Sequence, residues 1–204
     1  MSNRYIKLET DEIEQILKSK IKDNSILLFD MDGTLIDTNF ANFLSYKKAI
    51  QQVTKSEIDL AYNPDERFNR GVLKATIPNL KEIDYNRIIL DKENFYNDFL
   101  SETKLNKKVS DILFRYSETN RTILVTNCRE KRANATLDYY RIRDKFEDII
   151  YRQLSKADNR INKFSHAISQ LAISPQSIIL FENENREIED AIKAGIVKHN
   201  IFKI

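Results

Sequence analysis

The sequence predicts an α/β fold in which a Rossmann-like parallel sheet is flanked by helices and carries an inserted α-helical cap. Short apolar runs alternate along the chain with segments of helical periodicity, a pattern typical of parallel sheets. The first apolar run ends in two aspartates, and ligands of open α/β sheets lie at the carboxyl ends of the strands. A long segment of helical periodicity separates the first run from the second, which indicates an insertion between two strands.

The first half of the chain supplies one helix, one strand and the cap. Apolar residues at helical spacing predict a helix over residues 11–22. Residues 26–29, Ile-Leu-Leu-Phe, predict a buried strand. Helical patterns then continue over residues 38–118, and no strand is expected before Thr122. We therefore expect a helical cap domain over residues 38–118 and a core domain formed by residues 1–37 and 119–204.

The second half of the core alternates strands and helices. Helices are expected after the strand at 122–125, over residues 162–171, and over residues 188–194, where Gly195 ends the last helix. Strands are expected at 122–125, 149–151 and 177–181, with an edge strand at 201–204.

The composition restricts the classes of protein to which the chain can belong. Lys and Arg total 33 and Asp and Glu total 31, so a net charge of +2 gives no general case for nucleic-acid binding. The single Cys128 excludes an intrachain disulfide and favours a reducing cytoplasm. No apolar run approaches the roughly 18 residues that cross a membrane, and the N-terminus lacks a signal-peptide core. We expect a cytoplasmic monomer or dimer with no membrane partner.

Asp30 and Asp32 follow the first strand, and their chemistry can be argued from their spacing. Being two residues apart near a strand end, both carboxylates can reach one small volume. Crowded carboxylates repel, so one is protonated or a hard cation such as Mg²⁺ lies nearby. One carboxylate could then attack a phosphate ester while the other transfers protons. Gly33 permits a tight turn, although Asp-Gly is also a common dipeptide of ordinary turns.

The segment 29–38, Phe-Asp-Met-Asp-Gly-Thr-Leu-Ile-Asp-Thr, resembles the first motif of the haloacid dehalogenase-like superfamily, whose members are mostly phosphohydrolases. The resemblance implies that Asp30 is the nucleophile and Asp32 the general acid/base. It also implies a magnesium ion held by Asp30, by the main-chain carbonyl of Asp32 and by a later acidic motif. Gly33 and Thr34 are expected to bind the substrate.

Thr126 and Asn127 follow the second core strand and resemble the second motif of the superfamily. A hydroxyl beside the free amides that open a helix suits a phosphoryl oxygen, although a simple helix cap is an equal alternative. The resemblance also requires a lysine before the acidic motif. Lys156, in the loop after the third strand, is favoured over Lys163, and each could instead be a solvated surface residue.

The acidic motif is expected at residues 181–187, Phe-Glu-Asn-Glu-Asn-Arg-Glu. Counting back from Gly195 places Asn183 where the superfamily usually has an aspartate, and Glu187 at its second acid. The expected metal residues are Asp30, Asp32, Glu182, Asn183 and Glu187. An amide ligates magnesium more weakly than a carboxylate, and the acids also suit an ordinary helix start.

The expected activity is magnesium-dependent hydrolysis of a small phosphorylated metabolite through an aspartyl-phosphate. Asp30, Asp32, Thr126 and Lys156 are the expected catalytic residues, and Gly33, Thr34 and Asn127 the expected substrate-binding residues. Two alternatives stay open: a phosphomutase that transfers the group to a sugar, and a catalytically weak phosphate-binding protein, which Asn183 suggests.

Overall fold

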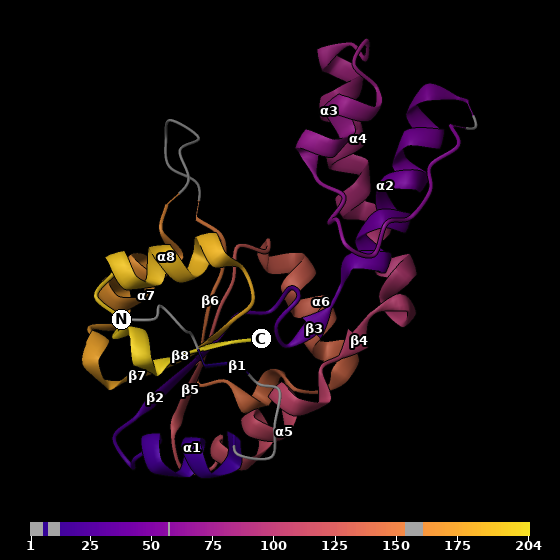
Figure 1. Cartoon of the computed structure of the whole chain (residues 1–204). Helices are drawn as coiled ribbons and strands as arrows, with labels where there is room; N and C mark the ends of the chain where they lie inside the picture. Colours follow the sequence, from indigo (N-terminus) through magenta and orange to yellow (C-terminus); the bar gives the residue numbers. More distant parts are fainter. Residues whose placement is uncertain (1–5, 8–12, 57, 154–160) are drawn as a thin grey trace. The chain divides into compact units, whose positions relative to one another are not determined.

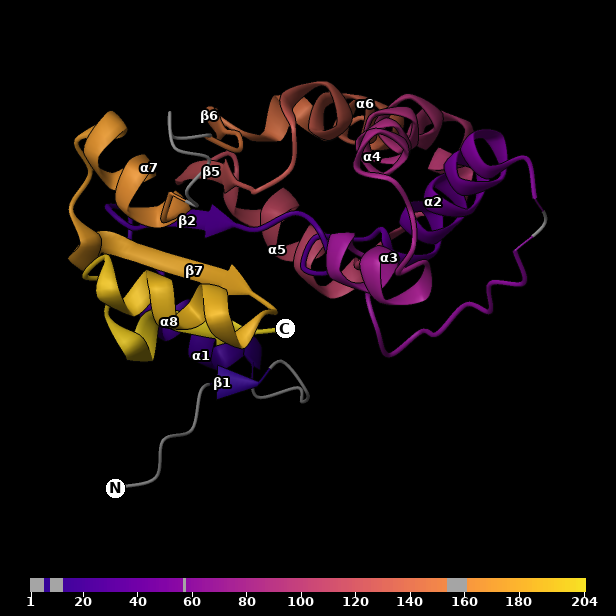
Figure 2. The same cartoon turned by 90° about the horizontal axis from the view of Figure 1, so that it is seen from above.

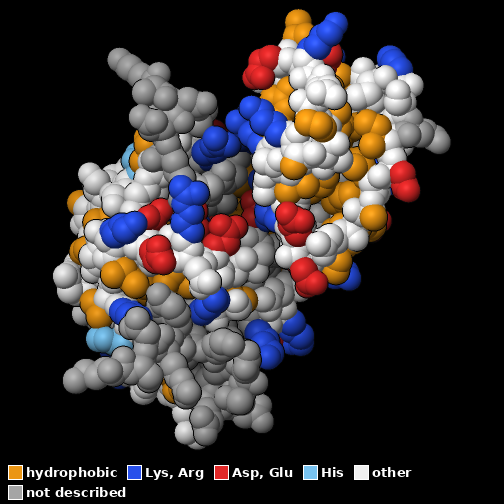
Figure 3. All heavy atoms as spheres, turned by 45° about the horizontal axis from the view of Figure 1, so that its top comes forward, with side chains coloured by type: hydrophobic (Ala, Val, Ile, Leu, Met, Phe, Trp, Pro, Cys, Tyr) orange, Lys and Arg blue, Asp and Glu red, His pale blue; other side chains and the backbone are white. Residues whose placement is uncertain are grey.

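The computed structural model describes residues 6–7, 13–56, 58–153 and 161–204. The chain divides into two compact units, a core formed by residues 1–35 and 106–204 and an inserted unit formed by residues 36–105. Figure 3 shows acidic and basic side chains mixed over the visible surface of each unit.

The core is built on a six-stranded sheet in which all neighbouring strands are parallel. In the register of the sheet, Phe29 lies between Leu124 and Phe181, so the strands that carry these residues end side by side. The residues after these strands therefore meet at one edge of the sheet (Figure 1). The order across the sheet is β1 (Ile6–Lys7), β8 (Ile201–Lys203), β7 (Ile178–Glu182), β2 (Ile26–Phe29), β5 (Arg121–Val125) and β6 (Asp148–Ile150).

Helices flank this sheet (Figure 2). Alternate strand residues face the two sides, and Leu28, Ile123 and Leu180 share one apolar cluster with Phe164 and Ile188 of two of the helices. On the sheet itself, Phe29 stacks on Phe181 with ring centroids 4.8 Å apart. The helices are α1 (Ile13–Lys20), α5 (Lys107–Tyr116), α6 (Glu130–Tyr140), α7 (Lys163–Leu171) and α8 (Asn185–Lys193), with 3₁₀ turns at Arg143–Lys145, Pro175–Ser177 and Lys198–Asn200.

The inserted unit is helical and has an apolar core of its own. Its helices bury a cluster that includes Phe43, Tyr46 and Ile88. The chain enters and leaves the unit through two short antiparallel strands, β3 (Ile36–Asp37) and β4 (Lys104–Leu105). The helices are α2 (Asn39–Thr54), α3 (Arg70–Thr76) and α4 (Glu82–Phe95), and a 3₁₀ segment covers Tyr96–Glu102.

The structure confirms the α/β class and the flanked parallel sheet, and it differs from the sequence prediction at several boundaries. The strands β3 and β4 lie within the segment expected to contain none, because two residues are too short to show a period. The inserted unit covers residues 36–105, and α5, expected in the cap, lies in the core unit. The strand at 201–203 was expected at the sheet edge, but β1 pairs with it there. No helix among the described residues is both long and apolar enough to cross a membrane.

Candidate active site

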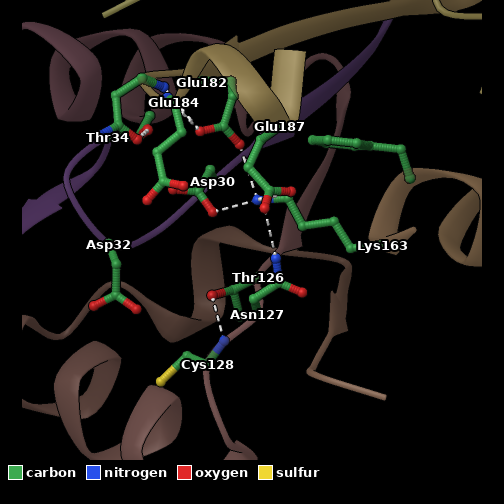
Figure 4. Close-up of polar contacts among 12 residues, drawn as sticks. Asp30, Asp32, Thr34, Thr126, Asn127, Cys128, Lys163, Glu182, Glu184 and Glu187 are labelled. Atoms are coloured by element: carbon green, nitrogen blue, oxygen red, sulfur yellow. Dashed lines mark hydrogen bonds and ion pairs between the residues drawn. The ribbon is translucent and has the colours of Figure 1, made fainter. Parts of the chain in front are cut away.

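The carboxyl ends of β2, β5 and β7 bring the predicted site residues together. The amide of Asp30 donates a hydrogen bond to the carbonyl of Phe181 at 3.1 Å, which continues the ladder between β2 and β7. The amide of Thr126 donates to the carbonyl of Ile150 at 2.9 Å. These main-chain bonds fix Asp30 and Thr126 at the same edge, next to Glu182, the last residue of β7 (Figure 4).

The turn after β2 is closed by Gly33 and Thr34. Gly33 has a φ of +86°, a left-handed conformation that glycine adopts at little cost. The hydroxyl of Thr34 donates to Oδ1 of Asn183 at 3.0 Å, which ties this turn to the loop after β7. Gly33, Thr34 and Asn183 therefore form one contact between the first and last motifs.

Lys163 lies at the centre of the polar cluster, and the ion pairs in Figure 4 meet at its ammonium. Its Nζ is 2.6 Å from Oδ1 of Asp30, 2.8 Å from Oε2 of Glu182 and 3.7 Å from Oε2 of Glu187. The side chain is only 3% exposed, so this ammonium is paired away from bulk water. Lys156, the lysine favoured from the sequence, lies outside the described residues.

The start of α7 places Lys163 in this position. Asn162 caps the helix, because its Oδ1 accepts hydrogen bonds from the amides of Phe164 and Ser165. The side-chain amide of Asn162 also donates to the carbonyl of Asp190 in α8 at 2.7 Å. The cap therefore fixes both where α7 begins and how its first residue approaches the sheet.

Glu182 anchors the lysine and the loop after β7. Its Oε1 accepts hydrogen bonds from the amides of Asn183 and Glu184 at 2.9 and 3.0 Å, and its Oε2 accepts from Lys163. The residue has no exposed surface. Protein donors engage both carboxylate oxygens, so Glu182 anchors Lys163 and the loop after β7, and its role as a metal ligand stays a prediction.

Asn127 and Glu187 connect the second and last motifs. The side-chain amide of Asn127 donates to Oε1 of Glu187 at 3.0 Å. Thr126 is buried, and its hydroxyl oxygen accepts a hydrogen bond from the amide of Cys128 at 3.0 Å. A hydroxyl that accepts in this way still has a proton to donate, and its use for a phosphoryl oxygen stays a prediction.

The cluster holds more negative than positive charge. Burial raises the pKa of Asp30, and Asp32 and Glu187 add to that rise while Lys163 opposes it. Burial and the neighbouring Asp30 raise the pKa of Glu182 to about 8. Burial alone would lower the pKa of Lys163, but the nearby carboxylates outweigh it and raise that pKa. Lys163 therefore stays charged and only partly offsets its carboxylate neighbours.

Mg²⁺ prefers oxygen ligands and keeps several waters when it binds to proteins. Within the described ranges, no group of three or more His, Cys, Asp or Glu side chains is arranged to hold a metal ion. The carboxylate of Asp30 and the amide oxygen of Asn183 nevertheless match the oxygen chemistry, and Asn183 is tied to the turn after β2 by Thr34. Burial is the largest cause of the raised pKa values of Asp30 and Glu182, and a bound hard cation would oppose that rise. The oxygen atoms of these side chains therefore suit Mg²⁺ chemically, although few side chains are available as ligands.

Sequence reasoning missed Arg132, the third residue of α6. Its Nη2 lies 3.2 Å from Oδ2 of Asp32, and its Nε lies 2.8 Å from Sγ of Cys128. The only signal in the sequence is the spacing of four residues between Cys128 and Arg132, which puts both on one face at the start of a helix.

Comparisons with known proteins identify a family and similar folds. A sequence model of the haloacid dehalogenase-like hydrolase family matches residues 27–200. No curated protein matches the chain. Similar solved structures include a haloacid dehalogenase-like hydrolase from Streptococcus pneumoniae, with 16% identity, coverage of 87% of this chain and 83% of that chain, and a TM-score of 0.66. A predicted phosphoglycolate phosphatase from Haemophilus somnus has 19% identity, coverage of 85% and 83%, and a TM-score of 0.67. The protein CbbY from Rhodobacter sphaeroides, solved with phosphate, has 15% identity, coverage of 84% and 83%, and a TM-score of 0.68.

Proposed function

The chain belongs to the haloacid dehalogenase-like hydrolase family, and we propose that it hydrolyses a small phosphate monoester through an aspartyl-phosphate on Asp30. The observation that carries this proposal is the position of Asp30. It follows β2 directly, and its Oδ1 lies 2.6 Å from the buried ammonium of Lys163. That pairing orients the carboxylate and opposes the rise in its pKa that burial causes, and a nucleophile needs the ionised form.

The reaction has two halves. In the first, Oδ2 of Asp30 attacks phosphorus, the ester P–O bond breaks, and Asp32 gives its proton to the leaving oxygen. In the second, Asp32 takes a proton from a water molecule as the water oxygen attacks phosphorus. The bond between Asp30 and phosphorus then breaks, which releases inorganic phosphate and restores both carboxylates to their starting states.

The surrounding residues would bind the phosphoryl group. The hydroxyl of Thr126 and the ammonium of Lys163 would donate to its oxygens, and Lys156 stays a candidate for the same role. Gly33, Thr34 and Asn127 would shape the pocket around it. Asp30, the main-chain carbonyl of Asp32, Asn183 and Glu187 are the groups that would hold Mg²⁺, which when bound would neutralise charge on the carboxylates and the phosphate.

The test is a phosphatase screen with p-nitrophenyl phosphate and a panel of phosphorylated metabolites, with and without Mg²⁺. We expect turnover that needs Mg²⁺ and that disappears in Asp30→Asn. Asp144→Asn is the matched control, because Asp144 is exposed and belongs to a 3₁₀ turn of the core. Turnover retained by Asp30→Asn would refute Asp30 as the nucleophile.

Asn183 favours a second candidate, a phosphate-binding protein with little catalysis. An amide in place of a carboxylate weakens the affinity for Mg²⁺, while the lysine and the hydroxyl still suit a bound phosphate. Calorimetric binding of inorganic phosphate, together with no turnover of any ester in the panel, would favour this alternative over the enzyme. The single Cys128 fits a reducing cytoplasm, where we expect either activity to operate.

A further inference from the structure

Arg132 links the helix α6 to the turn that carries Asp32. Its Nη2 lies 3.2 Å from Oδ2 of Asp32, a residue 100 positions earlier in the chain. The side chains of Arg132 and Asp32 are only 10% and 14% exposed. An ion pair shielded to this degree holds its geometry better than one at an open surface.

The guanidinium is itself held in place. Its Nε donates to Sγ of Cys128 at 2.8 Å, and Cys128 is 1% exposed. The amide of Cys128 in turn donates to the hydroxyl oxygen of Thr126 at 3.0 Å. The turn that presents the phosphate-binding hydroxyl of Thr126 therefore also fixes the arginine that contacts Asp32.

Asp32 has particular need of such a partner. It lies just before Gly33 in the turn after β2, and the terminal torsion of an aspartate is broad. A proton-transfer group must keep its reacting oxygen within hydrogen-bond reach of the leaving group and of water. The planar guanidinium, anchored at Nε, can fix the orientation of the Asp32 carboxylate through its Oδ2.

We propose that Arg132 is a positioning residue that orients the carboxylate of Asp32 for proton transfer. The inference rests on the proposed phosphatase function and extends it to a residue outside the family motifs read from the sequence. Arg132 contacts Asp32, whereas Lys163 contacts Asp30 and Glu182, so the two cations serve different carboxylates. Protonation by Asp32 matters most when the leaving oxygen is basic. The loss of kcat on replacing Arg132 should therefore depend on the basicity of the leaving group of the ester.

The test compares the native protein with Arg132→Met, Arg132→Lys and Lys131→Met on phenyl phosphate and p-nitrophenyl phosphate. Lys131 is an exposed cation next to Arg132 on α6 and is the matched control. For phenyl phosphate we expect Arg132→Met to lower kcat about 100-fold with little change in KM, since misplacing a catalytic group by about 1 Å has an effect of that order. For p-nitrophenyl phosphate, whose leaving group needs no proton, the loss should be smaller. Lysine at this position should restore part of kcat, and Lys131→Met should match the native protein.

Each other outcome has a definite meaning. A native protein that turns over neither ester would overturn the proposed function and this inference together. With an active native protein, an unchanged kcat in Arg132→Met would overturn the positioning role alone. A rise in KM at constant kcat would instead identify Arg132 as a substrate-binding residue. If Arg132→Met does not fold, Arg132→Lys carries the test, and equal losses on both esters would count against the proposal.

Discussion

The side-chain amide of Asn183 lies directly against the α-carbon of Gly33. A β-carbon built on Gly33 would lie 2.5 Å from Nδ2 of Asn183 and 3.2 Å from its Cγ. Contacts under 3.0 Å are not tolerated by β-carbons, so only glycine fits at this position while Asn183 keeps its place. The first and last motifs of the site are thus packed against each other by one glycine and one amide.

Gly33→Ala should therefore destabilise the protein and disrupt the site. A left-handed non-glycine residue costs about 1–2 kcal/mol, and the contact with Asn183 adds to this cost. Gly195→Ala is the control, because Gly195 also has a positive φ of 94° but its β-carbon would meet only Pro175 at 3.5 Å. Chemical denaturation should show a larger loss of unfolding free energy for Gly33→Ala. Equal losses in the two variants would show that the contact with Asn183 is unimportant.

Asn183→Asp should have opposite effects with and without Mg²⁺. The new carboxylate would keep the oxygen that accepts from Thr34, but it would add negative charge next to Glu182, whose Oε1 accepts from the amide of residue 183. We expect a lower Tm without metal and tighter Mg²⁺ binding, by about tenfold or more, because a charged ligand binds this ion better than an amide.

Calorimetric titration with Mg²⁺ and thermal unfolding would measure both effects. Asn185→Asp is the control, since it adds a charge at the exposed start of α8, two residues away. A Mg²⁺ affinity that is the same in native protein and Asn183→Asp would show that residue 183 is not a ligand.

Lys163→Met should be strongly destabilising at neutral pH. The change leaves Asp30, Glu182 and Glu187 without their shared ammonium, and removing one member of a buried ion pair costs about 3–5 kcal/mol. The loss should shrink at acidic pH, where the carboxylates take up protons. Urea unfolding of Lys163→Met, with Lys193→Met as the exposed control, would measure this.

The variant Lys156→Met distinguishes whether Lys156 or Lys163 is the phosphate-binding lysine. If Lys163 is the phosphate-binding lysine, Lys156→Met should retain both phosphate affinity and turnover. A loss of phosphate binding in Lys156→Met without loss of stability would assign that role to Lys156 and leave Lys163 as a structural cation.

Stability should fall as the pH rises from about 4.5 to about 8 in the metal-free protein. The pKa of Glu182 rises from 4.5 to about 8 on folding, so the folded state binds the proton more tightly than the unfolded state. Stability decreases with pH wherever the folded state holds more protons, and Asp30 shifts in the same direction. Unfolding free energies measured across this range should show a shallower slope in Glu182→Gln. An identical slope would contradict the raised pKa.

The sheet and the first motif could be predicted from the sequence because their signals are local. The apolar run at residues 26–29 is short and bounded, and the same holds for the strands that contain Ile123 and Leu180. Parallel strands that end together then place Asp30 and Thr126 at one edge without further information.

The remaining site residues depend on contacts between distant segments. Lys163 and Lys156 both precede the acidic motif, so their positions in the sequence do not distinguish them. The direction of the Lys163 side chain follows from the cap that Asn162 forms at the start of α7. Arg132 is one cation among many, and its contact with Asp32 spans 100 residues. The two-residue strands at 36–37 and 104–105 form because they pair with each other. A pairing between segments so far apart leaves no local pattern in the sequence.

The hydrogen bond between the amide of Asn106 and the carbonyl of Leu35, 2.9 Å long, has a consequence for protein engineering. The side chain of Asn106 adds a second bond, to the carbonyl of Thr34 at 3.0 Å. The chain therefore leaves the core and returns to it at one point, and every strand of the six-stranded sheet lies outside the segment between. We expect that a short linker or another folded module can replace residues 36–105 and join Leu35 to Asn106, because the connectivity of the sheet would stay the same.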